Sequence, residues 1–477
     1  MSVSAQYKPS KAILGLGGGF YDAVEAARFP TLILRFRNQA QARRLGLGEL
    51  SEEEWEAHFG RFVPLPGGLE RPLALRYHGY QFRQYNPDLG DGRGFLFAQL
   101  EDPVDGRLLD LGTKGSGTTP WSRGGDGRLT LKGGVREVLA TEMLEALGVY
   151  TSRSFSLFET GEQLVRGDEP SPTRSSVLVR LSHGHIRFGS FERHAFNGDK
   201  ARITGLLDYC IERFFPSLER VVAEDRPIEF LREVCHRSAE LAASWMVAGF
   251  VHGVLNTDNM NVTGESFDYG PYRFLPRYDE DFVAAYFDYQ GLYKYGDQHL
   301  AVIWNLSRLA EALSHIAPQG TLGDTLFDFL PTYMAALVRR FVRRLGLISQ
   351  GAERDSELVR AAQDFLTSSP VGYDRFFFDW YGGAISQTRA LKGSSAALYE
   401  GPLFSAFRQK LRRYEPLAPQ RLELAYFQRE APCALLIDEI ERIWAAIDER
   451  DDWAPFVAKI HDIRQMKEAC GLAALGA

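Results

Sequence analysis

The chain has 477 residues, with 55 Lys and Arg against 62 Asp and Glu, so its formal net charge is −7. Hydrophobic residues make up 45% and charged residues 25%, which is typical of a globular protein and excludes a disordered, collagen-like or coiled-coil chain. The slight acidic excess disfavours a general nucleic-acid binder, and no window is apolar for long enough to predict a membrane helix.

The N-terminus and the cysteines indicate the compartment. Glycines 17–19 break the short apolar stretch after Lys8 and Lys11, so no signal peptide is predicted. The cysteines are spaced too widely for a zinc knuckle or a disulfide framework, and free thiols are expected. They are Cys210, Cys235, Cys433 and Cys470. The sequence therefore favours a bacterial-type cytoplasmic location, with a mitochondrial leader as the open alternative.

The first sixty residues are polar and predict helices over 39–50 and 51–59. Ser51 and Glu54 have the spacing of a capping box, so we expect a helix to begin there. From about residue 73 to 193, short β-like runs alternate with glycine, and the predicted strands are 95–100, 108–112 and 176–181. A helix is predicted over 134–147, where apolar residues recur at helical spacing.

After about residue 200 the pattern is mainly helical. Helices are predicted over 228–250, 300–313, 326–345 and 435–447, with a polar loop over 253–276. Four arginines at 339, 340, 343 and 344 are expected on a solvated helix face.

A β-rich lobe followed by a larger helical lobe is the outline of an α+β, protein-kinase-like bilobal fold. The first lobe is predicted over 1–195, with an N-terminal helical extension and the glycine loops. The second is predicted over 196–477, with a catalytic and metal loop at 252–271 and a C-terminal extension.

Three glycine-rich runs lie close together at 89–93, 112–117 and 124–128. Glycine lacks a Cβ, so its backbone can approach a ligand closely. Each run alone is typical of a hairpin turn. Three of them, two with an arginine and one with a lysine, indicate a phosphate cradle, although neither the P-loop pattern nor the dinucleotide fingerprint is present.

Four charged residues are candidates for holding phosphates. Lys114 ends a predicted strand and Glu137 follows in the next helix, a pairing that in kinases holds the lysine against the nucleotide. Arg180 and Arg187 are seven residues apart, and guanidinium groups bind phosphate oxygens bidentately. A surface salt bridge and surface arginines are the alternative interpretations.

The strongest local motif is the segment 252–259 followed by Asp268. Kinases place a catalytic Asp two residues after a His, a metal-binding Asn further on, and later a second metal-binding Asp. Asn259 and Asp268 occupy the two metal positions, and their oxygens suit Mg²⁺. Val254 stands at the base position and cannot take a proton, so Asp258 is the available substitute. A polar loop that caps a helix is the alternative.

In their order and number, these motifs resemble the selenoprotein O family (SelO, also called YdiU), pseudokinases that transfer AMP to proteins. The resemblance covers about residues 70–315. It is carried by segments 89–93, 114–117, 125–128, 136–137, 185–192, 252–259 and 268–271, with further matches at 295–298 and 304–310.

The resemblance implies that ATP binds in reverse of the usual kinase orientation, with its α-phosphate exposed. It implies that Asp258 is the proton acceptor, that Asn259 and Asp268 bind Mg²⁺ or Mn²⁺, and that Glu137 holds Lys114. The implied nucleotide contacts are Gly90, Gly92, Arg93, Lys114, Asp126, Gly127, Arg180 and Arg187. The implied partners are ATP and proteins with Ser, Thr or Tyr hydroxyls; no nucleic-acid or membrane partner is expected.

Two features depart from the family pattern. The run Gly-His-Gln-Phe-Gly reads Gly-Tyr-Gln-Phe-Arg at 79–83, which is expected to place a tyrosine and a bulky cation near the nucleotide. Segment 282–288 lacks the usual cysteine, so a disulfide from this loop to the C-terminus is not expected. The alternatives are a conventional kinase-type phosphotransferase and a non-catalytic nucleotide-binding scaffold, with UMP transfer open as a side activity.

Overall fold

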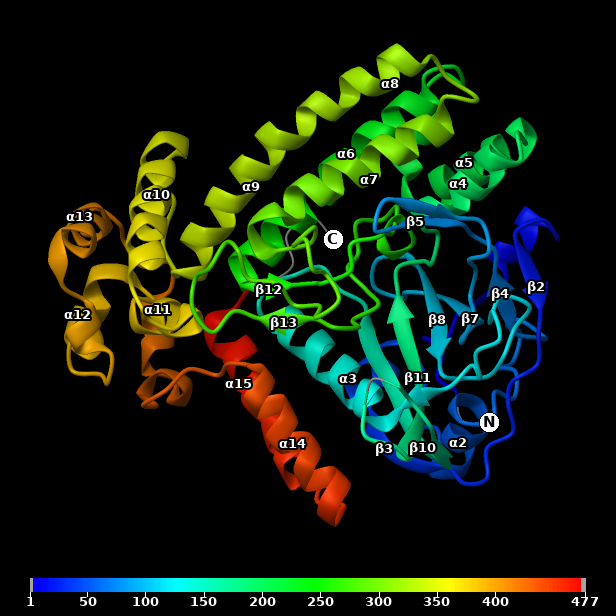
Figure 1. Ribbon diagram of the computed structural model, residues 1–477, viewed down its shortest axis with the longest axis horizontal. Coiled ribbons are helices and arrows are strands. Elements are labelled where there is room, and N and C mark those ends of the chain that lie inside the picture. The colour runs from blue at the N-terminus through cyan, green and yellow to red at the C-terminus, as the bar shows by residue number, and fades with distance from the viewer. Residues whose placement is uncertain (1–2, 168, 473–477) are drawn as a thin grey trace.

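The computed structural model describes residues 3–167 and 169–472 (Figure 1). A curled antiparallel sheet is built from the first part of the chain, and the second part is mainly helical. This mixed arrangement is that of the bilobal, kinase-like fold predicted from the sequence.

The main sheet has the strand order β2-β4-β7-β8-β11-β10-β3, with β1 paired to β7 and β9 to β11. Separate ladders join β5 to β6 and β12 to β13. The strands are β1 Pro9–Ser10, β2 Tyr21–Ala23, β3 Ile33–Arg37, β4 Leu73–Leu75, β5 Gly79–Gln81, β6 Gln84–Asn86, β7 Leu96–Glu101, β8 Leu108–Lys114, β9 Leu129–Thr130, β10 Arg153–Leu164, β11 Thr173–Ser182, β12 Phe250–Val251 and β13 Arg273–Phe274.

The α-helices cover the sheet and form the second lobe. They are α1 Gln39–Arg44, α2 Glu52–Phe59, α3 Leu131–Ala146, α4 Phe188–Phe196, α5 Lys200–Phe214, α6 Arg226–Ala248, α7 Gln298–Leu313, α8 Gln319–Thr325, α9 Phe329–Arg344, α10 Ala352–Ser368, α11 Tyr373–Asp379, α12 Gln387–Ala390, α13 Gly401–Leu411, α14 Ile437–Arg450 and α15 Ala454–Cys470. None of the helices within the described residues is long and apolar enough to cross a membrane.

Most of the predicted elements are confirmed. The predicted strands correspond to β7, β8 and part of β11, and the predicted helices to α2, α3, α6, α7, α9 and α14. Helix α2 begins with the expected capping box, in which Ser51 Oγ accepts from Glu54 N at 3.2 Å and the Glu54 side chain accepts from Ser51 N at 3.1 Å. The first sixty residues are not only helical, because β3 pairs with β10 at the edge of the sheet.

The sequence pattern does not predict strand β10, because two of its buried positions are serines rather than apolar residues. Ser156 Oγ accepts from Trp55 Nε1 at 3.0 Å, and Ser154 Oγ lies 3.0 Å from Thr141 Oγ1. Ser156 therefore bonds to α2 on one face of the sheet and Ser154 to α3 on the other. Residues two apart in a regular strand point to the same face, but β10 has a register shift between these two serines, so they point to opposite faces.

Both faces of the sheet are covered. Helix α3 packs against β10 and β11 through an apolar side that includes Val135 and Leu139. The side chains of Val177 and Val179 belong to a second cluster, together with Trp55 of α2. Because neighbouring strand residues point to opposite faces, the sheet is held between two apolar layers, which fixes the strand ends at the cleft.

Only part of the arginine-rich side of α9 is the solvated face that its charges predict, because Arg339 is exposed whereas two other arginines are not. Arg340 and Arg344 are buried, at 8% and 5% exposure. Arg340 Nη1 donates to Gly148 O at 3.2 Å, and Arg344 donates to Val247 O and to the Asp374 carboxylate. The two guanidinium groups therefore bind carbonyls just after α3 and near the end of α6, where cations are favourable.

The C-terminal helices return to the first lobe. Helices α14 and α15 pack against α3, and the orange and red ribbon lies beside it in Figure 1. Asp451, which follows α14, lies 3.0 Å from Arg35 Nη2 and 2.6 Å from Arg174 Nη2 on the sheet. The predicted lobe boundary between residues 195 and 196 falls at the end of α4 and stays a prediction.

Candidate active site

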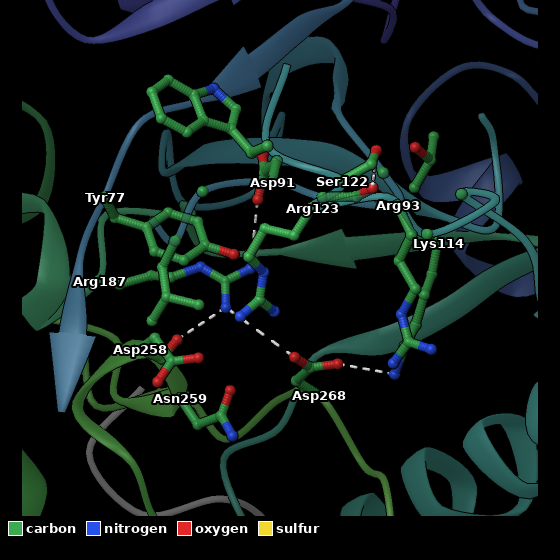
Figure 2. A pocket seen from close by; sticks show the side chains of 18 of the residues that line it. Tyr77, Asp91, Arg93, Lys114, Ser122, Arg123, Arg187, Asp258, Asn259 and Asp268 are labelled. Carbon is green, nitrogen blue, oxygen red and sulfur yellow. Dashed lines mark hydrogen bonds and ion pairs between the residues drawn. The ribbon is translucent and has the colours of Figure 1, made fainter. Parts of the chain in front are cut away.

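A polar cavity of about 630 Å³ lies where the glycine-rich segments of the first lobe face the loop that contains residues 254–268. The predicted site residues line it, except Glu137, which lies behind Lys114. Its cationic residues are Arg93, Lys114, Arg123, Arg128, Arg166, Arg180 and Arg187, and its acidic residues are Asp91, Asp126, Asp258 and Asp268 (Figure 2). Such a wall suits a ligand with several negative charges.

The glycine loops form one edge of the cavity. A Cβ at Gly90 would lie 2.4 Å from Trp121 Cγ, so this position accepts only glycine without rearrangement. Ser122 Oγ donates to Gly92 O at 2.5 Å, and Thr119 Oγ1 donates to Asp91 O at 2.5 Å. The segments 89–93 and 119–122 therefore pack against each other and are joined by hydrogen bonds.

The glycine run at 124–128 forms a further part of this edge. Gly127 has φ +68°, and a Cβ there would lie 2.2 Å from Gly117. Asp126 is exposed and lies 2.8 Å from Arg166 Nη1. Arg128 is bound to the Glu162 carboxylate at 2.8 Å.

Lys114 connects the two lobes electrostatically. It ends β8 and donates to Glu137 of α3 and, at 2.7 Å, to Asp268 Oδ1. Arg180 Nη1 lies 3.4 Å from the same oxygen. Burial would raise the pKa of Asp268, but Lys114, Arg180 and Arg187 outweigh it and hold this pKa well below its usual range. Asp268 is therefore an ionised carboxylate inside a ring of cations.

Arg187 is held rigidly at the centre of the cavity. Its Nη1 donates to Asp258 O at 2.7 Å, and its Nη2 lies 3.5 Å from Asp91 Oδ1. Its guanidinium lies 4.5 Å from the centre of the Tyr77 ring and 4.8 Å from that of Phe267. Arg187 and Arg180 are each only 4% exposed, so neither is the surface arginine that the alternative interpretation supposed.

Asp258 has the properties of a general base. It lies in a short 3₁₀ turn, Thr257–Asn259, and among the described residues its buried Oδ1 has no hydrogen-bond partner. Burial raises the pKa of Asp258 to about 6; Arg187 opposes this, and the charge of Asp268 adds to it. Val254 lines the same cavity and offers no proton acceptor. A carboxylate that lines the cavity and has one oxygen without a hydrogen-bond partner among the described residues is suited to accept a proton from a bound hydroxyl.

Asn259 and Asp268 fit a magnesium ion. Asn259 Nδ2 donates to Val254 O at 3.0 Å, which leaves its amide oxygen for a ligand. Among the described residues, no group of three or more His, Cys, Asp or Glu is arranged to hold a metal ion. One amide oxygen and one carboxylate are what Mg²⁺ uses when water and substrate phosphates complete its coordination.

A hairpin made by β5 and β6 fixes the loop that carries Asp258. Tyr80 N donates to Thr257 Oγ1 at 2.8 Å, and Phe82 N donates to Asn256 Oδ1 at 3.0 Å. Thr257 Oγ1 in turn donates to Glu192 Oε2 at 2.8 Å. The two contacts of the hairpin join residues more than 170 positions apart, and they position the residues immediately before Asp258.

The departures at positions 80 and 83 lie outside the cavity wall. The Tyr80 ring lies 5.3 Å from that of Trp304, and the Arg83 guanidinium lies 5.6 Å from the centre of the same ring. Neither residue is among those that line the cavity in the described part of the chain. Gln81, which lies between them, does line the cavity, so their expected position near the nucleotide stays a prediction, and both side chains lie beside Trp304 of α7.

The sequence motifs did not single out Tyr77, Asp91 and Arg123 as site residues. Asp91 and Arg123 are each next to a glycine in a recognised motif, which was the available signal. Tyr77 carries no such signal, because only the packing of its ring on Arg187 brings it into the cavity wall.

Comparison with known proteins identifies the relatives of this chain. The sequence model of a family described as "Protein adenylyltransferase SelO" matches residues 2–464. A protein of Synechocystis sp. named "Protein nucleotidyltransferase YdiU" is 46% identical, over 94% of this chain and 96% of its own length. Proteins of the same name from Gloeobacter violaceus and Trichodesmium erythraeum are 47% and 45% identical; the alignments cover 96% and 97% of this chain and 95% and 98% of theirs.

Proposed function

The chain belongs to the SelO family, and on this premise we propose that it is a protein adenylyltransferase, which transfers AMP from ATP to Ser, Thr or Tyr hydroxyls of proteins and releases pyrophosphate. The observation that carries the proposal is that Val254 stands where kinases have their catalytic base, while Asp258 supplies a carboxylate nearby. The usual kinase base is absent. Asp258, four residues later, lines a cavity rich in cations, and one of its carboxylate oxygens has no hydrogen-bond partner among the described residues.

In the proposed reaction, Asp258 accepts the proton of the target hydroxyl. The hydroxyl oxygen forms a bond to the α-phosphorus, and the bond from this phosphorus to the oxygen of the β-phosphate breaks. Pyrophosphate carries away the electron pair of that bond. Preorganised cations stabilise the negative charge that develops, at no further cost of reorganisation.

The proposed roles of the other residues follow from their places in the cavity. Glu137 holds Lys114 in position, and Asn259 and Asp268 would hold Mg²⁺ or Mn²⁺, which supplies positive charge to phosphate oxygens when bound. The proposed nucleotide contacts are Gly90, Gly92, Arg93, Lys114, Asp126, Gly127, Arg180 and Arg187.

Two further proposals concern the whole chain. We keep residues 1–195 and 196–477 as its two lobes, with ATP bound between them. We also place the protein in the cytoplasm. All four cysteines are free thiols, three of them buried, which is compatible with a reducing compartment.

Labelled ATP tests the proposal directly. The wild-type protein is incubated with ATP and a mixture of candidate substrate proteins, with ³²P at either the α- or the γ-phosphate. We expect protein-bound label from the α-isotope only. Label from the γ-isotope only would contradict AMP transfer and favour a conventional phosphotransferase. Competition with unlabelled UTP measures the preference for the base.

A matched pair of variants tests the base. Asp258→Asn keeps the size and polarity of the side chain but removes the proton acceptor, whereas Asp448→Asn makes the same change at an exposed position of α14. We expect Asp258→Asn to lose transfer while it retains nucleotide binding by calorimetry, and Asp448→Asn to behave as wild type. Unchanged labelling in Asp258→Asn would contradict the assigned base. Nucleotide binding by the wild-type protein without any protein-bound label would favour a scaffold.

A further inference from the structure

Arg123 is a cation of the cavity wall that the sequence motifs left without a role. Within the described part of the chain, its side chain makes no hydrogen bond or ion pair. Arg128 and Arg166 line the same cavity, but each is bound to a carboxylate, Glu162 and Asp126 respectively, at 2.8 Å. Arg123 is therefore a charge that the protein itself leaves unneutralised.

The side chain of Arg123 points inward although the residue is exposed. Figure 2 shows it extending into the cavity, toward the region of Arg187 and Asp258. A flexible cation gains nothing by facing another cation across a polar cavity unless an anion lies between them.

The backbone supports this orientation. Arg123 has φ +49°, in the left-handed region that residues other than glycine rarely adopt. The loop is fixed just before it, because Ser122 Oγ donates to Gly92 O and Thr119 Oγ1 donates to Asp91 O. Strained backbone of this kind is found at ligand sites, where the surrounding structure holds it in place.

The cations of the cavity lie near different carboxylates, some near Asp268 and others near Asp258. Lys114 and Arg180 contact Asp268 at 2.7 and 3.4 Å. Arg123 extends toward Arg187 and Asp258 instead (Figure 2). Arg187 lies between the two ends, since it contacts the Asp258 carbonyl and lies 3.9 Å from Asp268.

We propose that Arg123 is a further phosphate-binding residue, which contacts the α-phosphate of the bound nucleotide at the Asp258 end of the cavity. The inference rests on the proposed function, because that function places the α-phosphorus beside Asp258. Lys114 and Arg180, at the Asp268 end, then bind the two phosphates that leave as pyrophosphate. Arg123 offers its planar group to the oxygens of the α-phosphate, on which negative charge grows as the hydroxyl attacks.

Binding measurements test the contact without requiring transfer. Arg123→Ala and Arg123→Lys are compared with Arg71→Ala, which removes an exposed arginine that pairs with Glu25. The ligands are AMP, adenosine and inorganic pyrophosphate, titrated by calorimetry. We expect Arg123→Ala to weaken AMP binding about tenfold or more, the effect of one charge-assisted hydrogen bond, and to leave adenosine and pyrophosphate within about twofold. Unchanged AMP affinity, or an equal loss for pyrophosphate, overturns the proposal.

Transfer assays then separate a phosphate contact from a contact with the base. We expect Arg123→Ala to lower kcat about 10²-fold with both ATP and UTP, because the two nucleotides share the α-phosphate. The rate ratio for the two diastereomers of ATP with sulfur on the α-phosphate is expected to change as well. A loss for one base only, or an unchanged diastereomer ratio, contradicts the contact.

The two proposals fail in different ways. If the wild-type protein gives no α-label on any protein, the proposed function fails, and the AMP and pyrophosphate affinities still decide the role of Arg123. If the wild type transfers AMP and Arg123→Ala transfers it equally well, only the inference about Arg123 fails. Arg71→Ala is expected to match the wild type throughout.

Discussion

The buried carboxyl of Glu265 is expected to make the free energy of unfolding depend on pH. A single substitution at this position can measure its contribution. Glu265 is 3% exposed and lies three residues before Asp268. Its Oε2 accepts from His183 N at 2.8 Å, just after β11. Burial raises the pKa of Glu265 to about 8, against the opposing effects of this hydrogen bond and of Arg153 and Arg107.

The sign and size of the effect follow from this pKa. Below the ordinary value of 4.5 the carboxyl is protonated in both the folded and the unfolded chain, and its contribution to stability is fully present. Between 4.5 and about 8 the unfolded chain releases the proton while the folded chain keeps it, so stability falls as pH rises. At about 1.4 kcal/mol for each pH unit, this interval costs up to about 5 kcal/mol.

Glu265→Gln tests this reasoning, because the amide keeps an acceptor for His183 N but does not titrate. Urea unfolding followed by tryptophan fluorescence is measured at pH 5, 6, 7 and 8 for the wild type, for Glu265→Gln and for Glu224→Gln, a control at an exposed position. We expect Glu265→Gln to gain stability relative to the wild type from pH 5 to pH 8, and Glu224→Gln to follow the wild type. An equal difference between Glu265→Gln and wild type at pH 5 and pH 8 would refute the argument.

Three further substitutions test the site and its support. Gly90→Ala places a Cβ against Trp121, so we expect ATP affinity by calorimetry to fall at least about tenfold, and unchanged affinity would contradict the close packing. Arg344→Met leaves Asp374 buried without its cation, which is expected to cost about 3–5 kcal/mol in urea unfolding; an unchanged midpoint would show that the pair contributes little. Thr257→Val removes the hydroxyl that bonds to Tyr80 N of the hairpin and to Glu192. We expect kcat for AMP transfer to fall about tenfold in this variant and Thr257→Ser to restore it, and a loss in both variants would refute this role.

The motifs identified residues that the structure brings together around one cavity, and they could do so because each motif is local in the sequence. Asn259 and Asp268 lie nine residues apart in one loop, and the glycine runs lie within forty residues of one another, so their order is visible without a fold. The helices were predictable for a similar reason, since a capping box or an apolar periodicity is complete within one segment. Strand β10 was not, because its buried serines are satisfied by partners that lie elsewhere in the sequence.

The sequence by itself determined which chemical groups the protein has available. They are glycines that leave room for a ligand, a lysine with its glutamate, two side-chain oxygens proposed to bind a metal ion, and Val254 where a kinase has its base. The tertiary structure alone decided how these groups are used. Among the residues that the structure describes, it left Arg123 without a hydrogen-bond or ion-pair partner, directed Arg83 to Trp304, and buried Arg344 against Val247 and Asp374. The physical reason is that the role of a charged side chain depends on which opposite charges and carbonyls lie within a few ångströms, and distant segments of the chain supply most of them.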